Sequence, residues 1–400
     1  MNEGPAAGLA DSGLADFCRL PRWRHGAGIA LVFLLLAVFF AGALSAPQPI
    51  EDEEVYAAAF ARVQQGLSPY GEPQFYYLPP FAWAGAWLET HLGQPMTLVL
   101  LRTANFLAMA ALLWAATAPW QLSWRARVVL AGGFGAISPA VELALAWGNL
   151  SPLAIAGWTA TFWLWRRRPL WAGVSFAAAM LVKPVAAIAL GLLALHRPKV
   201  EGFGKAVRVG PQLLAAAWAA LLLAAALAAA PFLRDFFSLS AGIPVAARSA
   251  SLQRLLYCFG ITVPALALTV GVAVFALLLL RRRPRSPLEL YLFAGIAGLL
   301  ATPLVWSHTL LLVLPLQSAA LALAYRRYRE GGRALELLAV GTLALALQLS
   351  NGLGGIETWP LPLQGLFVAL PCLAPLALGL YYSAERLRAD RPAPNPPARP

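Results

Sequence analysis

A run of four acidic residues, 51–54, stands near the start of a chain that has only 18 acidic residues among 400. Acidic side chains stabilise a helix N-terminus and glycine often follows a helix end, so this run and Gly66 predict a helix over 51–65. A spacing of four places Asp52 and Tyr56 on one face of that helix. A carboxylate held there could take a proton from a substrate hydroxyl. The structural alternative is an ordinary solvated helix N-terminus.

Residues that could complement this acid are spread along the chain. Lys183 precedes Pro184 between two apolar runs, where a lysine must line a cavity, reach the membrane surface or pair with an anion. Arg248 and Arg254 flank a short serine-containing stretch, and His308 begins a further apolar run. With the acid, these cations and the imidazole suit a phosphate-bearing lipid. The structural alternatives are a snorkelling lysine, solvated loop arginines and a histidine satisfied within the fold.

These residues must be positioned by a scaffold that lies in a membrane. The chain is 60% hydrophobic and 12% charged, with a mean hydropathy of +0.67, which excludes an ordinary soluble globule. Only helices and closed barrels satisfy their backbones in lipid, and these apolar runs are too long for barrel strands. A spanning helix needs about 20 apolar residues. We therefore predict an all-α polytopic membrane protein with about 10–13 transmembrane helices, some of them broken or half-inserted.

The predicted passes follow the apolar runs of the sequence. They lie at roughly 27–45, 97–118, 126–145, 150–165, 169–182, 184–195, 209–231, 261–280, 288–301, 308–325, 334–349 and 361–382. They divide the chain into a cytosolic N-terminal arm (1–26), a single transmembrane domain (27–385) and a disordered, proline-rich cytosolic tail (386–400). Residues 47–95 form the first extracytoplasmic loop. Its 81–92 segment is apolar and Trp-rich but too short to cross, which predicts an interfacial helix.

Basic residues give this scaffold a predicted orientation. All but six of the 30 Lys and Arg residues fall on one side of the passes, which the positive-inside rule makes cytoplasmic, together with both termini. The six exceptions share the outer side with the acidic run: Arg62, Arg102, Lys183, Arg234, Arg248 and Arg254. We interpret Arg62, Arg102 and Arg234 as incidental to the site, as salt-bridging or snorkelling residues. The net charge of +12 then reflects topology, and no nucleic-acid partner is expected.

Composition adds two further expectations. Arginine outnumbers lysine 27 to 3 and alanine is abundant, which fits a GC-rich bacterial genome and hence a bacterial inner (cytoplasmic) membrane protein. The three cysteines have no paired spacing, so we expect neither a disulfide framework nor a zinc site. A divalent cation could bind the acidic run, but cationic side chains can neutralise a phosphate alone. No metal or cofactor is therefore predicted.

Six short motifs, in order along the chain, resemble the integral-membrane GT-C glycosyltransferases of family 87, which are polyprenyl-phosphate-mannose-dependent mannosyltransferase-like proteins. The motifs are Asp52-x-x-x-Tyr56-x-x-Ala59, Gly66-x-x-Pro69-Tyr70, Phe75-x-Tyr77-x-Pro79-Pro80, Gly148-Asn149, Lys183-Pro184 and Thr302-Pro303-Leu304-Val305-Trp306-Ser307-His308. Two positions depart from the family pattern. The family commonly has Gly-Gln-x-Asn where this chain has Gly148-Asn149, and Thr309 stands where family members often carry a second polar residue.

The resemblance implies a GT-C fold with juxtamembrane helices in the first loop. It also implies transfer of a sugar, mannose by family default, from a polyprenyl-phosphate donor to a hydroxyl of a glycan or glycolipid acceptor, with inversion. Asp52 would be the general base. The donor phosphate would bind Lys183, Arg248, Arg254 and His308, and the substrates would contact Tyr56, Tyr70, Tyr77, Asn149 and Trp306. A helix-capping asparagine and a belt of interfacial aromatic residues are the structural alternatives.

Two other classes of function are compatible with the sequence. Broken helices and an intramembrane charge also occur in transporters, so a transporter or flippase for a lipid-linked or small anionic substrate is the main alternative. A non-catalytic scaffold of an envelope complex is the other. The sequence shows no inverted repeat, and its rare polar residues gather at one face instead of the midplane, which favours the enzyme. The identity of the sugar and acceptor, the polyprenol length and the oligomeric state stay open.

Overall fold

The computed structural model describes residues 19–71, 75–164, 168–183, 211–241, 249, 251–263, 272, 294–300, 305, 307–349 and 358–389. In this part of the chain all regular elements are helices and no strand occurs. Among the described residues, four helices are long and apolar enough to cross a membrane, and two bent helix pairs raise the number to six if each pair is one span. The all-helical, multi-pass membrane class predicted from composition is thereby supported.

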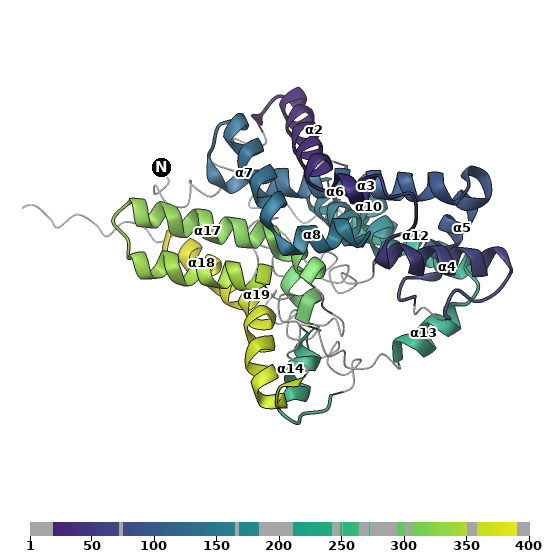
Figure 1. The fold of residues 1–400 in the computed structure, drawn as a ribbon. Coiled ribbons are helices and arrows are strands. Elements are labelled where there is room, and N and C mark those ends of the chain that lie inside the picture. Colours follow the sequence, from purple (N-terminus) through teal and green to yellow (C-terminus); the bar gives the residue numbers. More distant parts are fainter. Residues whose placement is uncertain are drawn as a thin grey trace, which may run out of the picture.

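The four candidate spans coincide with predicted passes. They cover Arg22–Phe39, Gln94–Trp120, Thr309–Arg329 and Leu361–Glu385. The helices that build them are α2 (Arg22–Phe39), α6 (Gln94–Ala116) continued by η1 (Ala118–Trp120), η3 (Ser307–Val313) continued by α17 (Leu314–Arg329), and α19 (Leu361–Ala389). The short α3 (Ala41–Leu44) follows α2 and leads toward the first loop (Figure 1).

Two pairs of consecutive helices are sharply bent. The 126–145 run folds as α7 (Trp124–Ile137) and α8 (Pro139–Ala146), which meet at 72°. Ser138 caps α8 through its side chain and Pro139 takes the first helical turn, a combination that starts a new helix. The 209–231 run folds as α12 (Pro211–Ala229), and α13 (Leu233–Ala241) leaves it at 102°. Shorter apolar helices are α9 (Ser151–Leu164), α10 (Pro169–Val182) and α18 (Ala334–Leu349).

Helices extend past both predicted terminal boundaries. Helix α2 begins at Arg22, inside the predicted arm 1–26, and α19 continues to Ala389, so the predicted disordered tail 386–400 starts as helix. Good helix formers such as Ala, Glu, Leu and Arg follow the last apolar run and let α19 continue beyond it. The 184–195 pass and most of the 261–280 pass lie outside the described residues. The expected total of 10–13 passes therefore stays a prediction.

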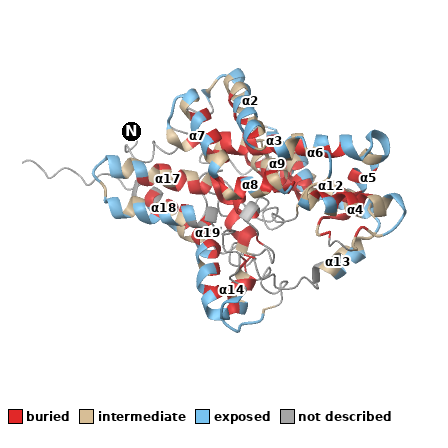
Figure 2. Cartoon of the chain, in the orientation of Figure 1, coloured by how far each residue is buried: buried red, intermediate tan, exposed pale blue. Residues whose placement is uncertain are grey.

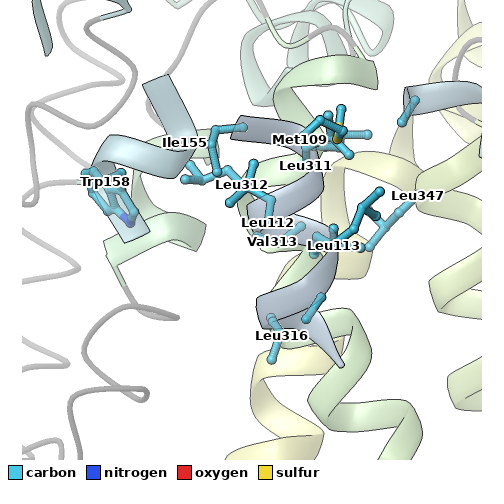
Figure 3. Packing of buried hydrophobic residues seen from close by; sticks show 14 of the residues in the cluster. Met109, Leu112, Leu113, Ile155, Trp158, Leu311, Leu312, Val313, Leu316 and Leu347 are labelled. Carbon is cyan, nitrogen blue, oxygen red and sulfur yellow. The ribbon is translucent and has the colours of Figure 1, made fainter. Parts of the chain in front are cut away.

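The main core forms around α6. Figure 3 shows α6 side chains meeting side chains from α9, η3, α17 and α18, namely Met109, Leu112, Leu113, Ile155, Trp158, Leu311, Leu312, Val313, Leu316 and Leu347. Helix α6 also packs on α2, α5 and α7. It therefore links the spans to the first loop, and Figure 2 shows the buried positions concentrated on the faces where these helices meet.

The first loop contains a packed helix pair. Helices α4 (Glu51–Gln64) and α5 (Pro79–Leu92) confirm the predicted helices 51–65 and 81–92, and they lie together beside α6 (Figure 1). Their contact is close: a Cβ atom at Gly85 would stand 2.1 Å from the Phe60 ring. Trp83 and Trp87 on the opposite side of α5 are 48% and 60% exposed, as expected of an interfacial helix. The pair thus presents a rigid N-terminal end of α4 to the spans.

Candidate functional site

The N-terminus of α4 docks on the turn between α8 and α9. The Asp52 amide donates to the Trp147 carbonyl at 2.9 Å, and the Leu150 amide donates to the Tyr56 hydroxyl at 3.4 Å. Gly148 makes the turn with φ of +71°, a conformation that glycine adopts without strain. A Cβ at Gly148 would also lie 2.5 Å from Glu53 Cγ. The glycine is therefore needed both for the turn and for the approach of α4.

Asp52 meets Asn149 at this junction. The Asn149 amide nitrogen donates to Asp52 Oδ2, while Asp52 is half-buried and Asn149 is buried. Burial raises the pKa of Asp52 above its ordinary value, and the Asn149 hydrogen bond and the positive charge of Lys183 oppose that rise. The result is a carboxylate that binds a proton more readily than an exposed aspartate. Such a group suits general-base catalysis, since proton affinity drives the transfer.

A chain of hydrogen bonds runs from Asp52 to Lys183. Lys183 follows the last residue of α10, and its Nζ donates to Ser151 Oγ at 2.7 Å. Ser151 Oγ donates in turn to Asn149 Oδ1 at 2.6 Å, and the Ser151 amide donates to the same oxygen at 2.9 Å. Four residues from α4, α9, α10 and the turn before α9 thus form one polar network. Three of them, Asp52, Asn149 and Lys183, are residues that the sequence analysis nominated.

Tyr56 and Tyr77 form a second polar contact beside Asp52. Their hydroxyl oxygens lie 2.7 Å apart, both side chains are buried, and the rings meet edge to face. Burial, followed by the negative charge of Asp52, raises the pKa of Tyr77, so its phenol stays protonated. Tyr70 borders this pair, because its hydroxyl donates to the Tyr77 carbonyl at 2.9 Å. The predicted tyrosines therefore gather at the same end of the first loop.

Glu53, the next residue after Asp52, has a different environment. It forms a salt bridge with Arg102 of α6, with Arg102 Nη2 2.6 Å from Glu53 Oε2 and each side chain 3% exposed. Arg102 Nε donates to Glu53 Oε1 at 2.9 Å, and the same guanidinium donates to the Ala46 carbonyl and, at 2.7 Å, to the Gln48 carbonyl. Arg102 is thus a salt-bridging residue, which was one of its two predicted roles. It ties the start of α4 to a candidate transmembrane span.

This tie holds a strained backbone in place. Glu51 has φ of +25°, which is unusual for a residue with a side chain. Glu53 Oε2 also accepts from the Ile50 amide at 3.1 Å and closes the first turn of α4. Strained residues persist only where the surrounding contacts over-determine them. The Glu53–Arg102 pair supplies those contacts one residue away from Asp52.

Asn105 is a further buried polar residue that the sequence analysis did not nominate. Its Nδ2 donates to the Asn149 carbonyl at 2.9 Å. Its Oδ1 is buried without a hydrogen-bond partner in the described part of the chain. With Glu53, Tyr56 and Leu150 it lines a narrow recess. Asn105 lies three residues after Arg102 on α6, so both project from one face toward the loop. That polar pair inside an apolar pass was the available sequence signal.

The remaining predicted residues lie apart from this network or cannot be placed. Arg254 in α14 (Leu252–Cys258) donates to Gln364 of α19 and lies over the Tyr257 ring. Figure 1 shows α14 well separated from α4. Arg248, Trp306 and the side chain of His308 are outside the described residues. The hydrogen bond from the Val305 amide to Ser249 Oγ, at 3.0 Å, does bring the neighbours of Arg248 and Trp306 together.

No family model, curated protein or solved structure matches this chain. Among the residues that the structure describes, no group of three or more His, Cys, Asp or Glu side chains is placed to hold a metal ion. The site combines the half-buried Asp52 carboxylate, the Asn149 amide that donates to it, and Lys183, which is joined to Asn149 through the Ser151 hydroxyl.

Proposed function

We propose that this protein is a GT-C type glycosyltransferase similar to family 87, which transfers a sugar from a polyprenyl phosphate to an acceptor hydroxyl. One observation carries the proposal. Asp52, Asn149 and Lys183 are 97 and 34 residues apart in sequence, yet one hydrogen-bonded network joins them at the end of the first-loop helix α4. An acid beside a cation, next to paired tyrosines, suits a reaction that moves a proton and releases a phosphate.

In the proposed reaction the acceptor hydroxyl oxygen attacks the anomeric carbon while the bond to the lipid phosphate breaks. Attack from the opposite side inverts that carbon. Asp52 takes the hydroxyl proton, and its raised pKa makes it a better acceptor. Asn149 engages Oδ2, which leaves Oδ1 to receive the proton. General-base assistance of this kind is worth about 10²–10⁴ in rate.

Lys183 is proposed to stabilise the phosphate as its charge develops. An ammonium held in place before reaction stabilises new negative charge best where water is excluded. In the structure the Lys183 ammonium donates to Ser151, and its positive charge acts on Asp52. The ammonium is therefore held close to the proposed base. Arg248 and His308 remain proposed partners for the phosphate. Arg254 would have to leave Gln364 to join them.

The proposal also covers location and architecture. We place the protein in a bacterial inner membrane with 10–13 passes, both termini cytoplasmic and the site facing outward, in contact with the donor lipid and a glycan or glycolipid acceptor. The exposed Trp83 and Trp87 of α5 would then lie in the lipid headgroup region. That level would bring the lipid phosphate close to the N-terminus of α4.

The test compares Asp52→Asn with Glu54→Gln in protein reconstituted into lipid nanodiscs. Both changes neutralise an acid of the first turn of α4, but Glu54 is exposed. With radiolabelled polyprenyl-phosphate mannose and an envelope glycan extract, we expect Asp52→Asn to lower transfer at least about 10²-fold. Glu54→Gln should leave transfer unchanged, and donor binding should survive in both variants.

Two outcomes contradict the proposal. Full turnover by Asp52→Asn would remove Asp52 from the reaction. A wild-type protein that transfers no sugar from a panel of polyprenyl-phosphate sugars, but moves such lipids across a bilayer, would establish the flippase instead.

A further inference from the structure

Ser151 lies at the centre of the polar network although the sequence analysis did not nominate it. It is the first residue of α9 and only 1% exposed. Its Oγ accepts from Lys183 Nζ at 2.7 Å and donates to Asn149 Oδ1 at 2.6 Å. Its amide donates to the same Asn149 oxygen at 2.9 Å. Ser151 is thus the residue that connects Lys183 to Asn149.

The direction of these hydrogen bonds follows from the groups involved. A lysine ammonium has donors and no acceptor, so Ser151 Oγ must be the acceptor in that contact. The serine hydrogen is then free for Asn149 Oδ1, which also receives the Ser151 amide. With Oδ1 held by two donors, the Asn149 amide nitrogen faces Asp52 and donates to it. If the asparagine turned over, its carbonyl oxygen would face the carboxylate and repel it.

We propose that Ser151 is a positioning residue, which holds Asn149 as a hydrogen-bond donor to Asp52 and couples the charge of Lys183 to the orientation of that base. The inference rests on the proposed function for its kinetic consequence. Ser151 acts through Asn149 and touches neither sugar nor phosphate. Its hydroxyl also keeps Lys183 at a fixed place at the end of α10.

Removal of the Ser151 hydroxyl should make Asp52 easier to protonate. Asn149 would lose one of the two donors that orient it, and a poorly oriented amide stabilises the carboxylate less. The charged and titratable groups around Asp52 are Lys183 from the end of α10, Tyr77 from the loop, Arg102 from α6 through Glu53, and Glu51, Glu53, Glu54 and Tyr56 of α4 itself. Of these groups only Lys183 bonds to Ser151, so a shift in Asp52 protonation reports the network that Ser151 forms with Lys183 and Asn149.

The experiment compares Ser151→Ala, Ser151→Thr and Thr161→Val in nanodiscs. Thr161 is the matched control: it is a fully buried residue on the same helix, ten residues after Ser151, and its hydroxyl donates to the Gly157 carbonyl. We expect Ser151→Ala to lower kcat about tenfold, as the loss of one buried hydrogen bond would, with little change in the donor KM. Ser151→Thr, which keeps the hydroxyl, should restore most of the rate. Thr161→Val should change neither constant.

A second measurement does not depend on activity. Infrared spectroscopy follows the protonated carboxyl band of Asp52, assigned by its loss in Asp52→Asn, as pH is varied. Ser151→Ala should move the midpoint to higher pH, and Thr161→Val should leave it in place. An unchanged midpoint in Ser151→Ala would overturn the positioning role. If the midpoint moves but the wild type transfers no sugar, the proposed function fails while the positioning of Asp52 by Ser151 stands.

Discussion

Asp52 and Glu53 are adjacent acids on one helical turn, but they face two different regions of the molecule. Glu53 faces the candidate span α6, where Arg102 satisfies it with a salt bridge in a site closed to solvent. Asp52 faces the α8–α9 turn, where it is half-buried and accepts from Asn149. A carboxylate in a complete salt bridge stabilises the fold, whereas a carboxylate with a raised pKa can accept a proton from a substrate.

The comparison of Glu53 with Asp52 shows how a reactive group can be held firmly in a loop. Loops are usually more mobile than the elements that they connect. Here the Glu53–Arg102 pair fixes the start of α4 to α6, and the packing of Phe60 against Gly85 fixes its far end to α5. Asp52 therefore sits on a rigid element and still keeps an incomplete set of partners. Glu53 thus anchors the helix, and the neighbouring Asp52 is available for chemistry.

The largest effect should come from the supporting side. Glu53→Gln leaves the Arg102 guanidinium buried without its counter-charge, and breaking a buried ion pair by removing one partner costs about 3–5 kcal/mol. Thermal unfolding in detergent should show this loss of stability. Glu54→Gln, one residue further and exposed, should cost almost nothing. Equal stability of the two variants would mean that the Glu53–Arg102 pair does not anchor α4.

The double variant Glu53→Gln with Arg102→Met sharpens that result. Replacing both members of a buried pair by uncharged groups often restores stability, because no unpaired charge remains. We expect the double variant to be more stable than Glu53→Gln alone. Transfer should stay low in it, since the carbonyls of Ala46 and Gln48 would lose the guanidinium that holds the start of α4. Recovery of full transfer would mean that the tie does not position Asp52.

The turn between α8 and α9, which contains Gly148, should give the next largest effect on stability. Gly148→Ala places a Cβ at a φ of +71° and only 2.5 Å from Glu53 Cγ, so strain and a clash coincide. A loss of about 1–3 kcal/mol is expected. Gly133→Ala in α7 is the control, because nothing lies within 4 Å of its added Cβ. Alanine should stabilise that helix by about 0.5–1 kcal/mol. A Gly148→Ala variant as stable as Gly133→Ala would contradict the close docking of α4.

The local part of this arrangement was predictable from the sequence. The acidic run and Gly66 predicted α4 within one residue of its end, because helix start and stop signals act over one turn. The motifs also named Asp52, Asn149 and Lys183, which the structure brings together, but the prediction named Arg254 as well, which lies apart. The broken 126–145 pass carried a readable signal as well, since Ser138-Pro139 is a typical helix start in the middle of an apolar run.

The partner choice of the two acids was not predictable from the acidic run alone. Glu53 and Arg102 are 49 residues apart, and their pairing depends on how α4 docks on α6, which is a tertiary property. A weaker signal did exist. Glu53 shares a helical face with Ala57 and Phe60, at spacings of four and seven, and all three are buried. A charge in line with apolar positions indicates a buried ion pair, and Arg102 was the cation at the same end of a neighbouring pass.

The smallest effect should appear on the reactive side, as a change in pH dependence. Burial raises the pKa of Asp52, and the hydrogen bond from Asn149 lowers it. Asn149→Ala removes the lowering contribution, so the pKa of Asp52 should rise further. A general base works only when deprotonated, hence activity should be lost at a higher pH than in the wild type as the solution is acidified. The profile of kcat/KM against pH measures this directly, because it reports the free enzyme.

The sign of that shift separates the two regions. Asn149→Ala should shift the acidic limb of the pH profile to higher pH, whereas Glu53→Gln should leave it near its wild-type position in the protein that remains folded. A downward shift in Asn149→Ala would mean that Asn149 does not stabilise the carboxylate form. If instead Glu53→Gln moved the limb as far as Asn149→Ala, the two acids would titrate as one unit and the division between them would be lost.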